Sequence, residues 1–377
     1  MTASDAERVA RATLSLIIEP GDHRSLRLVS EVGAQLLVEG IGDAERYPQF
    51  EAARARLAVA DGAGELERAE AHGIRFVIPG DDEWPAQLED LADAEPVQLR
   101  GGVPFGLWVA GPLPLSELSA SVAVVGSRDS TSYGEQIAVE ITSGIGRAGV
   151  TTISGAAIGI DYAAHRGAVS VGAPTVAVLA CGVDRDYPVR HAEMLRQLRS
   201  GHAVVSEVPM GGAPQRIRFL ARNRLIAALA KGTVVVEAAA RSGALNTMNW
   251  AQRLQRVTMG VPGPVTSVAS LGVHHQLRSG GAALVTSAAD VLELVGEMGS
   301  NLTEFPRGPD GERDLLELRD RQILDAVPVY RAVAAESIAR LASVGLADVL
   351  DALPTLEQAG HVERDGGGWR LAEPARG

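Results

Sequence analysis

The chain has 377 residues, a formal net charge of −12 and one cysteine, Cys181. This length allows two or three domains, and a single cysteine excludes an internal disulfide framework. With 46% hydrophobic and 22% charged residues, the composition predicts an ordered soluble protein. We expect it in the reducing cytoplasm and not in a membrane. The first residues lack the pattern of a secretory signal, and no apolar stretch reaches the roughly 18–20 residues of a membrane span.

The negative charge is unevenly distributed along the chain. Residues 1–120 hold 10 basic and 21 acidic residues, residues 121–299 hold 16 and 12, and residues 300–377 hold 9 and 14. Within 212–256, eight basic residues stand against a single acidic residue, Glu237. Local charge indicates a binding partner better than net charge does. The middle of the chain therefore favours an anionic ligand.

The chain begins with helical spacing of apolar residues. This spacing predicts a helical N-terminal domain over residues 1–72. The domain resembles the SAM and helix–hairpin–helix types. A β-rich connector follows, with turns at Pro79-Gly80 and Gly101-Gly102.

From residue 121 the pattern changes to short β-branched runs separated by helix-length stretches. Near-continuous apolar strands that alternate with helices predict a parallel sheet covered on both faces. We therefore expect an α/β, Rossmann-like doubly wound domain over residues 73–299, with its ligand at the carboxyl ends of the strands. The predicted strands are "SVAVVG" (121–126), "GVTTIS" (149–154), "PTVAVLA" (174–180), "HAVVSE" (202–207), "GTVVVEA" (232–238) and "RVTMGVP" (256–262).

The C-terminal part combines a linker with a small helical module. Glycine, proline and charged residues predict a linker over 300–314. Three helical stretches and a hairpin then predict a winged-helix domain over 315–377. Its recognition helix would hold Asp348, Asp351 and Glu357 but no lysine or arginine, which disfavours entry into a DNA groove and favours a protein partner.

Three loops of small residues follow predicted strands. In the first, Gly126, Ser127 and Arg128 offer backbone N–H groups, a hydroxyl and a guanidinium to a phosphate. The loop has neither the GxGxxG nor the Walker A pattern, so we expect no dinucleotide or triphosphate site. The alternative is a tight turn with a solvated arginine.

The second loop contains Ser154 and Gly155, followed by a helix with Asp161 and His165 on one face. These two side chains could form an acid/base pair or half of a metal site. We expect instead a local Asp–His hydrogen bond, because no cluster of further ligands completes a metal shell.

The third loop contains Ser242 and Gly243, with Asn246 and Thr247 in the first turn of the next helix. All three loops come from carboxyl ends of strands and should meet at one edge of the sheet. A row of phosphates explains such a groove better than a single small metabolite.

We read Cys181 as a buried small apolar residue.

Arg222, Asn223 and Arg224 come just before an apolar run. We expect Asn223 to be the N-cap of a helix that begins at Arg224. Two cations at the positive end of a helix dipole are unfavourable without an anion. The arrangement predicts a bound phosphate or a carboxylate partner, for which Glu207 or Glu237 could serve; the alternative is a surface helix with solvated arginines.

Taken in order, these motifs resemble the DNA-processing protein A (DprA, or Smf) family. The similarity spans about residues 74–290, and the N-terminal helices and C-terminal module resemble accessory domains of that family. The motifs are "VAVVGSR…YG", "ISGAAIGIDYAAH", "VLACGVDRDYP", "VVSEVPMGGAP…RFLARNRLIAALA", "VVVEAAARSGALNT" and "GVPGPV".

The resemblance implies a protein without catalytic residues, metal or cofactor. It would bind single-stranded DNA without sequence preference, protect it, and load RecA on it during natural transformation, usually as a homodimer. Carried over residue by residue, the DNA-binding positions are Gly126, Ser127, Arg128, Ser154, Gly155, Arg216, Phe219, Arg222, Asn223, Arg224, Ser242 and Gly243.

The chain departs from the family pattern at a few positions. Ala221 replaces the usual proline before the Arg-Asn-Arg element, and Ala244 replaces a loop hydroxyl. An asparagine usual after the last strand is replaced within "GVHHQL". The alternative function is a nucleoside-monophosphate phosphoribohydrolase-like enzyme, but the corresponding segments "PMGGAPQ" and "SGALNTMNW" lack its catalytic glutamate.

Overall fold

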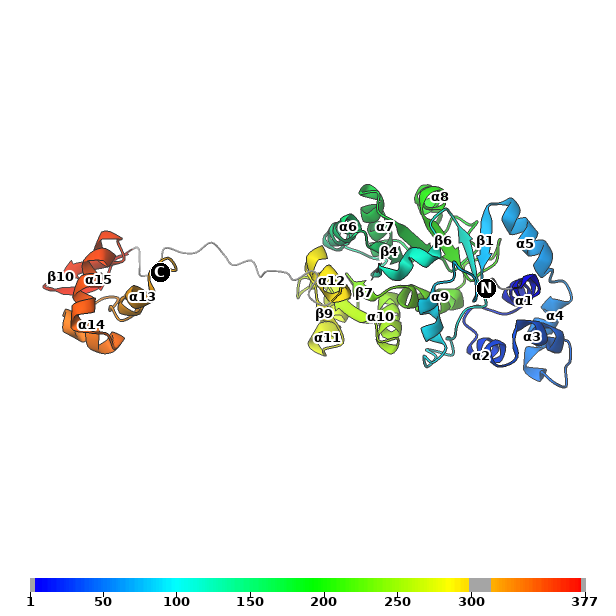
Figure 1. Ribbon diagram of the computed structural model, residues 1–377, viewed down its shortest axis with the longest axis horizontal. Coiled ribbons are helices and arrows are strands. Elements are labelled where there is room, and N and C mark those ends of the chain that lie inside the picture. The colour runs from blue at the N-terminus through cyan, green and yellow to red at the C-terminus, as the bar shows by residue number, and fades with distance from the viewer. Residues whose placement is uncertain (1–3, 298–312, 374–377) are drawn as a thin grey trace. The chain divides into compact units, whose positions relative to one another are not determined.

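The computed structural model describes residues 4–297 and 313–373 (Figure 1). The chain divides into two compact units, Met1–Thr303 and Glu304–Gly377. The predicted linker, 300–314, lies almost wholly outside the described residues. Across the described ranges, no helix combines the length and apolar character that a membrane span requires.

A nine-stranded sheet forms the centre of the first unit, in the order β1-β2-β6-β5-β4-β3-β7-β8-β9. All six predicted strands are confirmed as β3 to β8, and these strands and β9 pair in parallel. β1 and β2 come from the predicted β-rich connector and add an antiparallel edge. The strands are β1 Ile74–Val77, β2 Leu107–Ala110, β3 Ser121–Val125, β4 Thr151–Ser154, β5 Thr175–Val178, β6 Ala203–Ser206, β7 Gly232–Val235, β8 Val257–Gly260 and β9 Ala283–Leu284.

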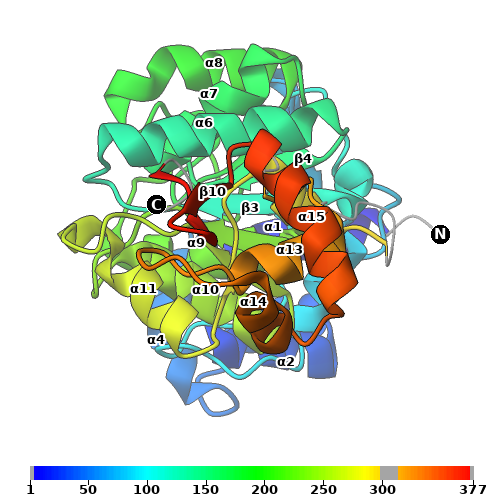
Figure 2. The same ribbon diagram turned by 90° about the vertical axis from the view of Figure 1, so that its left-hand side faces the viewer.

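Helices cover both faces of this sheet, as predicted for a doubly wound fold. Successive residues of β3 point to opposite faces: Val122 and Val124 pack on one helical layer, and Ala123 and Val125 on the other. Figure 2 shows α6, α7 and α8 on one side of the sheet and α9, α10 and α11 on the other. These helices and α12 span α6 Ser132–Arg147, α7 Ile160–Ser170, α8 Ala192–Gly201, α9 Arg216–Leu229, α10 Gly243–Arg253, α11 Leu271–Arg278 and α12 Ala288–Val295.

Five helices precede the sheet, and the first and last of them pack on its antiparallel edge. Ala12 and Ala69 pack with Phe76 and Trp108 of the antiparallel edge. The helices therefore belong to the same compact unit as the sheet, and a separate domain over 1–72 stays a prediction. They are α1 Asp5–Ile17, α2 His23–Val32, α3 Ala34–Ile41, α4 Glu51–Leu57 and α5 Gly62–Ala71.

The second unit has the predicted sequence of elements, three helices and a hairpin. Ile338, Leu353 and Trp369 belong to its own apolar core. β10 pairs antiparallel with β11 around the turn at Gly366-Gly367, where both residues have positive φ. The winged-helix class stays a prediction. The elements are α13 Leu318–Asp325, α14 Ala335–Ala342, α15 Leu346–Gln358, β10 Val362–Asp365 and β11 Gly368–Leu371.

The start of α9 differs from the prediction. The helix begins at Arg216 and continues without a break to Leu229, so Asn223 is not an N-cap. Residues 221–229 are all buried, and packing on the sheet decides the helix rather than the capping preference of asparagine. Asn223 instead donates its side-chain amide to Asn246 Oδ1 and Gly243 O. Residues two positions apart in an α-helix are rotated by roughly 200° about the helix axis, so Arg222 and Arg224 point in nearly opposite directions.

Arg224 forms a buried ion pair that fixes α9 over the sheet. Its Nη1 and Nη2 donate to the two carboxylate oxygens of Glu207, just after β6, at 2.5 and 2.6 Å. Nε donates to Gly102 O and Nη1 also to Ala221 O, both at 3.0 Å. The carboxylate partner that the sequence left open is therefore Glu207. The prediction of Arg224 as a DNA-binding residue is wrong, because its side chain is wholly buried and its donors are engaged.

We expect Arg224→Met to lower the free energy of unfolding by about 3–5 kcal/mol, because it leaves the Glu207 carboxylate buried without its cation. Urea unfolding of the purified protein measures this. Arg253→Met is the matched control: it removes an exposed pair with Glu95 and should change stability by less than about 1 kcal/mol. Equal stability of the two variants would contradict the structural role of the buried pair.

Candidate functional site

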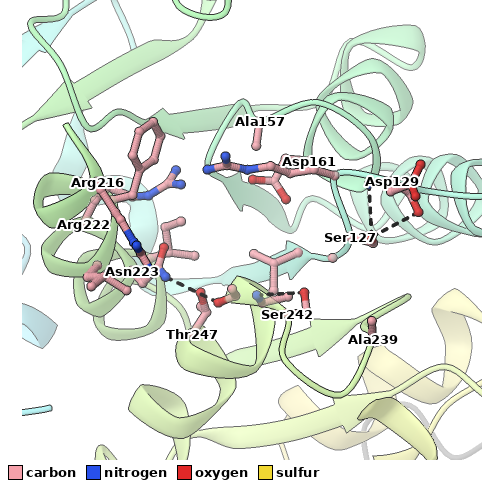
Figure 3. A pocket seen from close by; sticks show the side chains of 18 of the residues that line it. Ser127, Asp129, Ala157, Asp161, Arg216, Arg222, Asn223, Ala239, Ser242 and Thr247 are labelled. Atoms are coloured by element: carbon pink, nitrogen blue, oxygen red, sulfur yellow. Dashed lines mark hydrogen bonds between the residues drawn. The ribbon is translucent and has the colours of Figure 1, made fainter. Parts of the chain in front are cut away.

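A pocket of about 700 Å³ opens beyond the carboxyl ends of β3 and β7 (Figure 3). β3 lies between β4 and β7, where the chain switches from one side of the sheet to the other, the usual ligand position in this fold. Nine of the twelve predicted residues line the pocket. They are Gly126, Ser127 and Arg128 after β3, Arg216, Phe219, Arg222 and Asn223 on α9, and Ser242 and Gly243 at the start of α10.

Two further predicted residues lie behind the pocket wall. Ser154 is fully buried and donates its hydroxyl to Val124 O at 2.7 Å, so it is not available to a ligand. Gly155 lies against the Arg222 guanidinium, which a Cβ at this position would overlap. The prediction that Ser154 contacts a ligand is therefore wrong. Gly155 stays a prediction, because it does not line this pocket but lines a smaller one that adjoins it beside Arg128 and Phe219.

The structure sorts the cations of 212–256 into two groups. Half of them pair with acidic residues from other segments: Arg218 with Glu19, Arg224 with Glu207, Arg253 with Glu95 and Arg256 with Asp90. Within the described residues, the other four have no carboxylate in ion-pair distance. Of these, Arg216, Arg222 and Arg241 line the pocket, together with Arg128. Three of the four unpaired cations of this segment are therefore gathered at the pocket, and Lys231 is the exception.

Arg222 is the buried cation of this group, with 6% of its surface exposed. Its Nη1 donates to Val178 O at 2.6 Å, and Nε finds no acceptor among the described residues. The pKa of Arg222 is lowered to about 10, mainly by burial and in part by nearby Arg128, while the Asp161 charge opposes the shift. A buried guanidinium with an unsatisfied N–H group would be stabilised by an anion in the pocket.

Phe219 lies among cations and a second aromatic ring. The guanidinium carbons of Arg128 and Arg222 lie 4.9 and 6.0 Å from its ring centroid. The ring of Tyr187 is 5.9 Å away and tilted by 51°. An aromatic ring offers a face on which an unpaired base can stack, and a neighbouring arginine can contact the phosphate of the same nucleotide.

Sequence reasoning missed two residues of this pocket, Tyr187 and Arg241. Tyr187 belongs to the recognised motif "VLACGVDRDYP", but nothing in that motif indicated a ligand contact. Arg241 was visible only as one cation in the charge count of 212–256. Tyr187 comes after β5 and Arg241 after β7, so their positions beyond the carboxyl ends of strands could have indicated that they lie at the ligand edge of the sheet.

Asp161 and His165 do not hydrogen bond to each other, so the predicted local bond is wrong. Asp161 lines the pocket and accepts backbone N–H groups, including that of Gly155 at 3.1 Å, and burial raises its pKa. His165 Nδ1 lies 2.8 Å from Thr175 Oγ1, and burial lowers its pKa to about 3. An acid/base pair is not assembled either. In the described part of the chain, no group of His, Cys, Asp or Glu side chains could hold a metal ion.

The remaining predictions concern Ser242, Glu237 and Cys181. Ser242 is the N-cap of α10 and accepts from Ala244 N at 3.3 Å. The Glu237 carboxylate accepts from Thr131 N and Oγ1 at 2.9 and 2.6 Å, so it braces the start of α6 and partners neither arginine. Cys181 is buried as predicted, and burial raises its pKa to about 11.

The fold and the pocket define a Rossmann-like protein with an arginine-lined pocket at the switch point of its sheet. The family "DNA recombination-mediator protein A" matches residues 75–296. The chain belongs to this family.

Relatives and solved structures agree with this assignment. A Mycobacterium tuberculosis relative that carries the name DprA is 42% identical over 326 residues, which cover 86% of this chain and 83% of the relative. The crystal structure of DNA processing protein A from Streptococcus pneumoniae superposes with a TM-score of 0.63 at 29% identity, over 78% of this chain and 98% of that one. The Helicobacter pylori structure, which concerns the single-stranded DNA binding mode of that protein, shares the fold with a TM-score of 0.51 at 23% identity over 58% and 94%.

We expect Arg222→Met to raise the free energy of unfolding by about 1–3 kcal/mol, because it removes a buried cation that lacks a carboxylate partner. Its folded-state pKa is lowered, so the cost is fully present below about pH 10 and is relieved as the pH rises through that value. Urea unfolding at neutral pH measures the gain. Arg224→Met, two residues along the same helix, should have the opposite sign, and a loss of stability in both would contradict the assignment.

Proposed function

We propose that this protein binds single-stranded DNA without sequence preference, protects it and passes it to RecA in natural transformation and recombination, without catalysing a reaction. The observation that carries the proposal is the group of unpaired arginines around Phe219, of which Arg222 is buried. The family is named for mediating recombination, and the Helicobacter pylori relative binds single-stranded DNA. Both support the proposal.

The geometry of the pocket favours a single strand over a duplex. Its cations offer contacts to phosphates, which carry no sequence information. Phe219 and Tyr187 offer ring faces, and every base has a face that can stack once it has left a duplex. A strand with unpaired bases can place both groups in one pocket, whereas a duplex keeps its bases inside.

RecA, a second copy of the chain and a cytoplasmic location belong to the same proposal, supported by the family assignment. For the second unit we propose a protein contact. α15 exposes Asp351 and Glu357 and has no lysine or arginine, so the helix repels a phosphate-lined groove. A shift of duplex DNA by residues 315–377 alone at physiological salt would contradict this part.

A phosphoribohydrolase-like enzyme is the second candidate, favoured only by the shared fold. Asp129 and Asp161 are the carboxylates that line the pocket in the described chain. Asp161 is held by backbone N–H groups rather than aimed at a ligand, so we assign it a supporting role. Release of free base from AMP, abolished by Asp161→Asn, would favour the enzyme.

We expect Arg128→Ala and Arg222→Ala each to weaken binding of oligo(dT). Each should also flatten the dependence of log K on log salt by roughly 0.7, the slope for one phosphate contact on a single strand. A gel-shift titration across a salt series, with single-stranded and duplex DNA of one sequence, measures both quantities. Unchanged affinity and slope in both variants would overturn the pocket as the DNA site.

Phe219→Ala should weaken binding by about 1–3 kcal/mol through lost stacking, equally for oligonucleotides of different sequence, and should leave the salt slope unchanged. Fluorescence anisotropy with oligo(dT) and a mixed-sequence strand measures this. Tyr330→Ala, which removes an exposed ring of the second unit, is the control and should retain full affinity. A change in salt slope for Phe219→Ala would count against stacking.

A further inference from the structure

The segment from Glu19 to Gly21, between α1 and α2, packs against the face of α9 that points away from the pocket. The Glu19 carboxylate accepts from Arg218 Nε at 2.8 Å and from Nη2 at 3.0 Å, a two-bond contact with the first turn of the helix. Only 14% of the Arg218 side chain and 28% of the Glu19 side chain are exposed. The contact is therefore partly shielded from water and from salt.

The same segment is fixed from its other side. Gly21 has a positive φ of 68° and comes so close to Ala221 that an added Cβ would lie 3.0 Å from the alanine Cβ. Its carbonyl accepts from Gly101 N at 3.0 Å, and Pro20 O accepts from Arg100 Nη1 at 3.2 Å. The connector before β2 thus holds the segment against the helix.

The first turn of α9 needs such support. Its N-cap position, Gln215, makes no side-chain hydrogen bond to the helix, and the first turn contains two cations, Arg216 and Arg218. Cations at the positive end of a helix dipole are unfavourable. Glu19 supplies the missing negative charge from another segment, and the Arg218 guanidinium is the main cause that lowers the pKa of this carboxyl.

We propose that Glu19 is a positioning residue for DNA binding: by holding Arg218, it fixes the first turn of α9 so that Arg216 and Phe219 face the pocket. Glu19 lines no part of the pocket itself. The inference rests on the proposed function, because it concerns the same pocket. It also gives the N-terminal helices a part in DNA binding.

A purely electrostatic role predicts the opposite sign. Glu19 is an anion near a DNA site, so its removal alone would draw phosphates more strongly. A positioning role predicts weaker binding instead, because Arg216 and Phe219 would no longer be held facing the pocket. The sign of the change in affinity therefore separates the two roles.

The experiment uses the full chain and compares Glu19→Ala, Arg218→Ala, Phe219→Ala and the double variant Glu19→Ala/Phe219→Ala, with oligo(dT) affinity as the readout. Glu19→Ala and Arg218→Ala should each weaken binding on the order of tenfold. The loss caused by Phe219→Ala should be smaller in the Glu19→Ala background, because the ring is already displaced. A general loss of stability would leave the two losses additive.

Asp81→Ala is the matched control. It also removes one carboxylate from a two-bond pair with an arginine of the N-terminal helices, Arg8, but it touches no part of α9. It should bind oligo(dT) at least as tightly as the wild type. Urea unfolding of every variant confirms that binding is measured on folded protein; if Glu19→Ala fails to fold, Arg218→Ala and its cycle with Phe219→Ala carry the test.

Failure of the positioning role and failure of the proposed function are distinguishable. If the wild-type chain binds oligo(dT) in a salt-dependent manner and Glu19→Ala binds as tightly or more tightly, the positioning role is wrong and the proposed function stands. Full additivity of the Glu19 and Phe219 losses would likewise overturn the positioning role. If the wild-type chain does not bind oligo(dT), the proposed function itself fails.

Discussion

The buried pair between Arg224 and Glu207 is the constraint on which the site depends. It joins the middle of α9 to the end of β6, and it does so where neither charge reaches water. A buried pair of this kind adds little net stability over apolar residues, but it tolerates no shift of either partner. The pair therefore fixes the rotation of the middle of the helix about its axis, and that rotation turns Arg222 towards the pocket.

The same helix shows how identical residues acquire different tasks. Arg218, Arg222 and Arg224 lie within seven positions of one helix, yet each meets a different environment. Arg218 pairs with Glu19 at a partly exposed contact, and Arg224 pairs with Glu207 in the core. Arg222 is buried with only the Asp161 carboxylate nearby, beyond ion-pair distance, and its Nε finds no acceptor among the described residues. Only the last of these leaves a charge for a ligand to neutralise.

Much of the fold was predictable, because parallel strands covered on both faces have a strong sequence signature. The strands β3 to β8 and the helix start at Ser242 follow directly from apolar runs and a capping residue. The start of α9 was not predictable, because burial on the sheet outweighs the capping preference of Asn223. Ala221 adds to this: a proline inside a helix would lose a backbone hydrogen bond, whereas alanine lets the helix continue.

The candidate site was predictable in its loops but not in its charges. Counting cations in 212–256 pointed to the correct region, but the count could not tell which arginines are neutralised by Glu19, Glu95 or Asp90, far away in sequence. Ser154 was misplaced for a related reason. A hydroxyl at the correct edge of the sheet can be used within the fold, as the Ser154 bond to Val124 O is, instead of meeting a ligand.

The pairing of half these cations bears on how the chain would meet polyanions under the proposed function. With a net charge of −12 the chain on average repels long nucleic acids, whereas three of the four unpaired cations of 212–256 line one recess. Under that function, admission depends on whether a flexible strand can enter the recess, rather than on charge at long range. A uniformly basic surface would instead bind duplex DNA and structured RNA without discrimination.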